Sequence, residues 1–204
     1  MRDVYVFMFP GIMYFWVYFI GQGPMLEILT ESQTHTLQRM LASPVSLSQF
    51  LLSKMIRCFL LSAATQFLLL FASAVLFGIN WGNPLLLIPG VLACALSVTG
   101  LLAFIYATAR TKEQAYSLSH VIVIVCALVG GSFFPFHEMP AFLQAIGRFS
   151  PNRWGVLAIQ TVAWSQPWAE LVKPVVFLCA LGLFGSATAL LVFCRRLGKG
   201  GETR

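Results

Sequence analysis

The sequence predicts an all-α, polytopic membrane protein with about five transmembrane helices, and three observations predict this fold class. First, 58% of the 204 residues are hydrophobic and only 10% are charged, whereas a soluble globular domain carries about 25% charged residues. Second, long apolar runs recur along the whole chain, and about 20 apolar residues cross about 30 Å of hydrocarbon. Third, these runs lack the period-two alternation of barrel strands, so helices must satisfy the backbone polar groups in lipid.

Five runs are long enough to be spans, and short connections join them into a single membrane domain, residues 1–204. Their expected bounds are roughly 4–20, 50–77, 85–109, 116–132 and 171–194. The first run is interpreted as a retained span, because no small-residue cleavage site of a signal peptide follows it. The five cysteines lie in or beside the spans without a CxxC pair, which is typical of packing residues and not of a disulfide framework or metal site.

The distribution of lysine and arginine predicts the orientation, because basic residues gather on the cytoplasmic side of a membrane protein. With the N-terminus outside and the C-terminus in the cytoplasm, nine basic residues lie inside and four outside. The inner nine are Arg39, Lys54, Arg57, Arg110, Lys112, Arg195, Arg196, Lys199 and Arg204, and the outer four are Arg2, Arg148, Arg153 and Lys173. The net charge of +6 is therefore a topology signal, and no basic surface with interleaved aromatics indicates nucleic-acid binding.

A polar stretch, TESQTHTLQRMLASPVS at residues 30–46, separates the first two spans. Leu37, Met40 and Leu41 recur at the three- and four-residue spacing of one helix face. The residue before a proline avoids helical backbone, so the helix is expected to end before Pro44. The stretch therefore predicts a short amphipathic helix along the inner membrane surface; the alternative is a passive interfacial helix that only turns the chain.

Residues 133–168 are too polar and too broken to cross the membrane, yet too apolar for a free loop. Two short helical pieces are expected within this range, AFLQAIGRF and GVLAIQTVAW, each of the length of an interfacial or re-entrant segment. Glycines and prolines punctuate them: Gly130, Gly131, Pro135, Pro140, Pro151 and Gly155. We expect a broken, re-entrant helical hairpin that enters the outer leaflet; an ordinary surface loop with an amphipathic helix is the alternative.

Motifs for covalent chemistry are missing from the sequence. The chain has no phosphate-binding GxxxxGK[ST] loop, no HExxH and no GxSxG. Ionisable residues, which usually mark ion pathways inside a membrane, are almost absent from the span centres, where Gln66 and His120 are the best polar exceptions and are expected to form interhelical hydrogen bonds. Energy for transport would therefore have to come from another chain.

Two motifs carry a resemblance to a known family. That family has a cytoplasmic E-x-x-x-G-T-L-E-x-L-L-x-[ST]-P-[VL]-S followed by a lysine, and this chain has ESQTHTLQRMLASPVS followed by Lys54. The outer GGSFFPFHEMPAFLQAIGRFSPNRW is similar to the family's G-x-x-[FY]-P-x-x-x-[ML]-P segment with its downstream S-P-x-x-W. In the order and topology of these motifs, nearly the whole chain resembles the permease subunit of type-2 ATP-binding-cassette (ABC) exporters, which include multidrug efflux proteins.

The resemblance implies a transport subunit that is not an enzyme and has no cofactor of its own, because ATP is bound by a separate ABC ATPase subunit. It implies a second permease chain, in a homo- or hetero-dimer, and a multi-pass location in the bacterial plasma (inner) membrane. By position, the ATPase-coupling residues are Glu31, Thr36, Leu37, Arg39 and Pro44, and the outer gate comprises Gly130, Gly131, Pro135, Pro140, Pro151 and Trp154.

Two departures from the family pattern qualify these expectations. His35 stands where the family has glycine, and Gln38 stands where it has glutamate. The family also has six spans, and this chain begins at what resembles the second. The alternative interpretation is therefore a truncated or non-transporting membrane scaffold subunit, and a small channel is a third that no filter-like polar motif favours. The scarcity of polar residues in the spans favours an amphiphilic or hydrophobic cargo.

Overall fold

The computed structural model describes residues 2–33 and 46–199 of the chain. Within these ranges the protein is helical and has no β-strand. The elements are α1 (Arg2–Gln33), α3 (Leu47–Phe77), α4 (Pro84–Thr108), α5 (Lys112–Val129), the 3-10 helix η1 (Phe136–Glu138), α6 (Ala141–Gly147), α7 (Pro151–Ala163) and α8 (Trp168–Lys199). Five of the described helices are long and apolar enough to cross a membrane, which confirms the predicted fold class.

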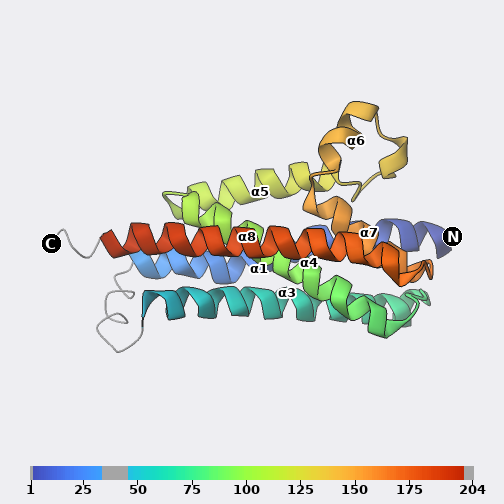
Figure 1. Cartoon of the computed structure of the whole chain (residues 1–204), viewed down its shortest axis with the longest axis horizontal. Helices are drawn as coiled ribbons and strands as arrows, with labels where there is room; N and C mark the ends of the chain where they lie inside the picture. The colour runs from blue at the N-terminus through green and yellow to red at the C-terminus, as the bar shows by residue number, and fades with distance from the viewer. Residues whose placement is uncertain (1, 34–45, 200–204) are drawn as a thin grey trace.

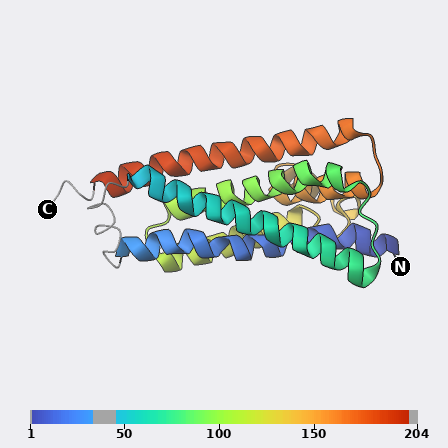
Figure 2. The same cartoon turned by 90° about the horizontal axis from the view of Figure 1, so that it is seen from below.

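The five long helices α1, α3, α4, α5 and α8 lie side by side along the long axis of the molecule (Figures 1 and 2). The start of α1 and the end of α8 lie at opposite ends of this bundle, as an odd number of crossings requires. We call these ends the N-end and the C-end. Short α6 projects at the N-end beyond α5, and α7 lies there among the long helices (Figure 1). Segment 34–45, between α1 and α3, lies outside the described residues.

The first span differs most from its predicted bounds. Instead of ending near residue 20, α1 continues through Pro24 to Gln33, and its membrane-spanning part covers Val6–Glu31. An internal proline removes one backbone hydrogen bond and crowds the preceding turn, but packing against neighbouring helices outweighs this penalty. Met25 and Ile28, just beyond the proline, are fully buried, so the bundle holds this part of the chain in helical form.

Helices α4 and α8 form the closest contact in the bundle, and glycines make it possible. A Cβ atom on Gly100 of α4 would lie 2.2 Å from the carbonyl oxygen of Gly182 of α8. A Cβ atom on Gly185 would lie 2.6 Å from the carbonyl oxygen of Gly100. Small residues allow this backbone-to-backbone approach between membrane helices, where van der Waals packing replaces the hydrophobic effect. The close packing leaves α4 the most buried of the five spans.

The remaining spans begin and end within a few residues of prediction because local signals set these points. The side chain of Ser46 accepts from the backbone N–H of Gln49, and the Gln49 side chain accepts in return, which forms a capping box at the start of α3. Helix α4 begins with Asn83 as its N-cap and Pro84 in its first turn. Left-handed Gly78, with φ of 63°, ends α3.

The predicted broken hairpin is present as η1, α6 and α7. The two short helices cover 141–147 and 151–163, close to the pieces expected from the sequence. Helix α7 is no surface helix, because Val156, Ile159 and Val162 are almost completely buried against the bundle. The side chain of Gln160 also donates to the backbone oxygen of Phe7 in α1 at 2.9 Å. The hairpin is therefore built into the N-end of the bundle.

Candidate functional site

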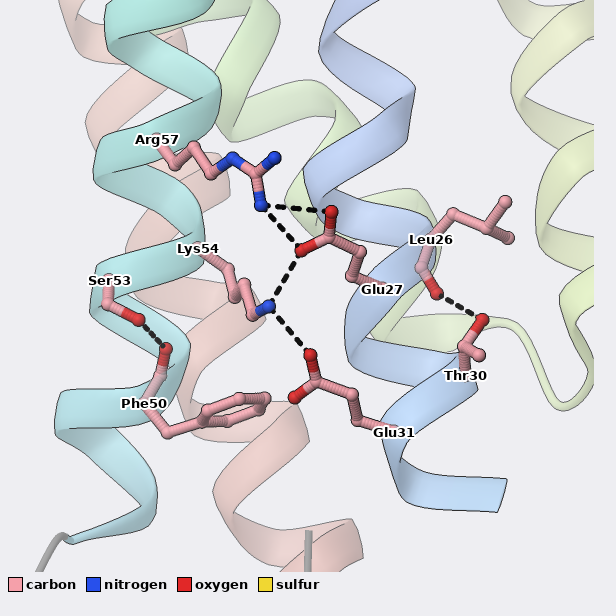
Figure 3. Close-up of polar contacts among 8 residues, drawn as sticks. All are labelled: Leu26, Glu27, Thr30, Glu31, Phe50, Ser53, Lys54 and Arg57. Carbon is pink, nitrogen blue, oxygen red and sulfur yellow. Dashed lines mark hydrogen bonds and ion pairs between the residues drawn. The ribbon is translucent and has the colours of Figure 1, made fainter. Parts of the chain in front are cut away.

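Four charged side chains join α1 to α3 (Figure 3). They lie toward the C-end of the bundle, where α1 ends and α3 begins. Lys54 Nζ of α3 lies 2.7 Å from Glu27 Oε2 and 2.8 Å from Glu31 Oε1, both on α1. Arg57 Nη1 lies 2.9 Å from Glu27 Oε1 and 2.8 Å from Glu27 Oε2. Two acids and two bases thus form one connected ion network of zero net formal charge, which we call the α1–α3 clamp.

Helical spacing accounts for the clamp. Glu27 and Glu31 are four residues apart on α1, and Lys54 and Arg57 are three apart on α3, so each pair lies on one helix face. The Lys54 side chain is only 14% exposed, and its ammonium lies 5.5 Å from the centre of the Phe50 ring. An ion pair sheltered in this way is screened by solvent less than a surface pair.

The clamp bounds the predicted coupling segment on both sides. Glu31 lies in the last turn of α1 and not in a separate surface helix as the sequence suggested. The other predicted coupling residues, Thr36, Leu37, Arg39 and Pro44, lie outside the described residues. The structure adds two residues to the candidate site that the sequence analysis missed, Glu27 and Arg57. The sequence signal for them was the spacing of the charges: two acids lie four residues apart before the connection, and two basic residues lie three apart after it.

The predicted outer gate gathers around the junction of α5 and α7. Gly130 is the C-cap of α5, and a Cβ atom on it would lie 2.7 Å from the Asn152 Cβ at the start of α7. Gly131 has φ of 80°, a left-handed conformation that favours glycine. Pro135 and Pro140 precede η1 and α6, and Pro151 is the first residue of α7. The sequence predicted these turns from residue types with fixed backbone preferences.

Trp154 links the hairpin to α8. Its indole Nε1–H donates to the backbone oxygen of Arg148 at 2.7 Å, which closes the turn between α6 and α7. Its ring stacks on Phe177 of α8 with ring centres 4.8 Å apart. On the other side, Ser150 Oγ donates to the backbone oxygen of Cys126 in α5 at 2.7 Å. A movement of α5 relative to α8 would therefore act on the hairpin directly.

Several polar side chains inside the bundle hydrogen-bond one another or the backbone of their own helix. The Tyr14 hydroxyl of α1 hydrogen-bonds Ser97 of α4, and the Tyr18 hydroxyl donates to Tyr14 at 3.4 Å. Gln66 was expected to reach a neighbouring helix, but its Nε2 donates to the backbone oxygen of Ser62 within α3. His120 likewise contacts the backbone oxygen of Tyr116, four residues earlier on α5.

The comparisons with known proteins agree with this architecture. A family model described as ABC-2 family transporter protein matches residues 2–191. The linearmycin resistance permease protein LnrN of Bacillus subtilis (strain 168) is 30% identical over 135 residues, which are 66% of this chain and 35% of that protein. The chain thus spans about a third of the length of this curated relative. No solved structure matches. From the family match over nearly its whole length, the chain belongs to the ABC-2 transporter family.

Proposed function

We propose that this chain is the permease subunit of an ATP-driven exporter and that segment 30–46 docks on a separate ATPase subunit. The observation that carries the proposal is the α1–α3 clamp, in which Lys54 contacts both Glu27 and Glu31 (Figure 3). The clamp joins the two helices at the points where they enter and leave the segment. A push on the segment would therefore move α1 and α3 together and be carried along both spans.

The proposed orientation places the C-end in the cytoplasm, where an ATPase would have access to the segment. The ends of α3, α4, α5 and α8 support this orientation. Lys54, Arg57, Arg110, Lys112 and Arg195 lie toward the C-end by their places in these helices. Such an excess of positive charge is typical of the cytoplasmic side.

A second permease chain is proposed to pack against α5. Only 22% of the membrane-spanning window of α5 is buried within the chain, the same share as for α8, so the polar residues of α5 decide between the two helices. Tyr116 and Ser117 are exposed on this helix, and His120 is half-buried. Lipid hydrocarbon offers such polar groups no hydrogen bonds, whereas a facing protein helix or a water-containing transport path does. The translocation path is proposed to lie between the α5 faces of two permease chains.

The proposed cargo is amphiphilic or hydrophobic. Within the described spans, charged side chains lie toward the helix ends, and the exposed surface of the helices is mostly apolar, with Tyr116 and Ser117 of α5 among the exceptions. A bare ion would find no coordinating ring of charges there. The relative LnrN is named a linearmycin resistance permease, and a role in resistance is a proposal for this chain.

The test is a mild-detergent purification of the tagged chain from its native membrane, with identification of every protein that copurifies. We expect a nucleotide-binding subunit, and we expect Glu31→Gln/Arg39→Gln to weaken its recovery and its ATPase stimulation. The matched control is Glu170→Gln/Lys173→Gln, which removes an acid and a base from an exposed pair, 3.5 Å apart, at the start of α8. This control should leave both readouts unchanged.

A stable preparation without any ATPase would contradict the proposal. It would favour instead a membrane scaffold that assembles with other membrane proteins and transports nothing. Unchanged recovery and stimulation in the Glu31→Gln/Arg39→Gln variant, with an ATPase present, would show that docking uses a different surface.

A further inference from the structure

Two adjoining cavities open beside the hairpin at the N-end of the bundle. Their volumes are about 340 and 180 Å³, and Phe136, Arg153 and Leu157 line both. Arg148 and Trp154 complete the larger one. The remaining residues of the smaller one are Phe7, His137, Gln160 and Trp164. The combined wall thus contains two arginines and a histidine and no carboxylate.

The two arginines of this wall are unpaired. Neither Arg148 nor Arg153 forms an ion pair with an acid in the part of the chain that the structure describes. Arg153 is half-buried, and its guanidinium lies 4.2 Å from the centre of the Phe136 ring. Burial lowers the pKa of Arg153 below its usual range, because desolvation penalises the charged form. An anion in the cavity would compensate this penalty.

The place of the cavity in the membrane indicates which anion is available. Trp154 and Trp164, on its wall, lie at the two ends of short α7, and Trp168 begins span α8. Tryptophan is enriched at the level of the lipid headgroups. Lipid phosphates lie at that level, and a guanidinium binds phosphate oxygens with two parallel hydrogen bonds.

We propose that this cavity binds the phosphate of an anionic phospholipid in the outer leaflet, through Arg148 and Arg153. Phe136 and Leu157 then contact the less polar part of the headgroup region. The larger volume, about 340 Å³, exceeds several times the roughly 30 Å³ that one water occupies in the liquid, so a phosphate with its glycerol fits. Two arginine charges favour an anionic headgroup over a zwitterionic one, whose ammonium they repel.

A lipid at this position would connect the bilayer to the hairpin. Arg153 lies between Asn152, whose Nδ2 donates to Ser132 Oγ at 3.1 Å, and Trp154, whose indole N–H closes the α6–α7 turn. A bound phosphate would hold this part of α7 in place. The site does not depend on the proposed ATPase coupling, because it lies at the opposite end of the bundle from the α1–α3 clamp.

The test is native mass spectrometry of the full-length protein, titrated with phosphatidylglycerol or with phosphatidylcholine of the same acyl chains. The wild type should retain phosphatidylglycerol preferentially. Arg148→Gln/Arg153→Gln should weaken that retention about tenfold or more, as expected for the loss of charge-assisted hydrogen bonds. Arg148→Lys/Arg153→Lys should show intermediate retention of phosphatidylglycerol, because lysine keeps the positive charge but cannot form the two parallel hydrogen bonds of arginine.

The matched control is Lys173→Gln, which removes one exposed basic charge from the start of α8 without touching the cavity. This variant should bind phosphatidylglycerol as the wild type does.

Equal retention of both lipids by the wild type would overturn the proposal. Retention of phosphatidylglycerol by Arg148→Gln/Arg153→Gln at the wild-type level would also overturn it. Binding of inorganic phosphate without binding of phosphatidylglycerol would show a site for a free anion and also overturn the lipid assignment. If the double variant fails to fold, Arg148→Gln alone is tested, because Arg148 is exposed. Wild-type affinity of this variant for phosphatidylglycerol would also contradict the proposal.

Discussion

Lys54 of α3 donates to Glu31 of α1 at 2.8 Å, across 23 positions of the chain. The two residues bound the segment predicted to couple this permease to an ATPase, and their contact fixes the spacing of the helices at both ends of it (Figure 3). Under the proposed function, a push on this segment would act on two spans at once, because the ion pair joins α1 to α3. The clamp is therefore the natural place to test coupling.

Replacing Lys54 with methionine should reduce ATPase stimulation while the protein remains folded. The change keeps an unbranched side chain but leaves Glu27 and Glu31 without their shared partner. We expect a loss of about 1.5–3 kcal/mol of stability, the value of hydrogen bonds to charged groups, and a clear fall in ATPase stimulation. Thermal unfolding in detergent and ATPase assays with the partner measure the two effects. Lys173→Met is the control, and equal ATPase stimulation in both variants would contradict a role of the clamp.

Replacing Gly182 with alanine should destabilise the fold through the α4–α8 contact. The new Cβ atom would lie 2.6 Å from the backbone oxygen of Leu96, so the helices must move apart. Overpacking costs about 1–3 kcal/mol, and the melting temperature should fall accordingly. Gly23→Ala on α1 is the matched control, since its Cβ atom meets nothing within 4 Å; a helical Gly-to-Ala change there should be neutral or stabilising. Similar melting temperatures for both variants would show that the contact is looser than described.

Replacing Trp154 with phenylalanine should loosen the hairpin while keeping its contact with α8. The ring can still stack on Phe177, but the hydrogen bond to the Arg148 backbone oxygen is lost, at a cost of about 1 kcal/mol. Hydrogen exchange of the amides of residues 148–154 should accelerate. Trp168→Phe, at an exposed position, should leave this exchange unchanged. Protection equal to that of the wild type in Trp154→Phe would mean that the indole N–H does not hold the turn.

A cysteine at Ser117 should form a disulfide between two permease chains under mild oxidation. Ser117 lies on the exposed face of α5, which is proposed to meet a second chain. Val176→Cys on α8, where valine is 59% exposed, provides the control because the second chain is proposed to pack against α5 and not against this helix. Both variants are made in a background without the five native cysteines. Non-reducing gels should show a dimer only for Ser117→Cys; the reverse result would place the second chain against α8.

Hydropathy and turn residues were sufficient to predict the five spans and the two short helices of the hairpin. Both signals are local: the length of an apolar run sets whether it can cross the bilayer, and Pro135, Pro140 and Pro151 restrict the backbone wherever they occur. The same local reasoning ended the first span too early, near residue 20. Packing against neighbouring helices keeps α1 helical through Pro24 to Gln33, and a local pattern does not contain that information.

The sequence by itself determined which parts of this protein lie in the membrane, since transfer into hydrocarbon depends on the composition of each segment. It also placed Glu31 within, and Lys54 shortly after, the segment predicted to couple to an ATPase. Only the tertiary structure decided that these two residues meet, that Glu27 and Arg57 join them, and that Gly100 contacts Gly182. Such contacts depend on how each helix is rotated and where it crosses its neighbour, which is settled by the packing of all five helices together.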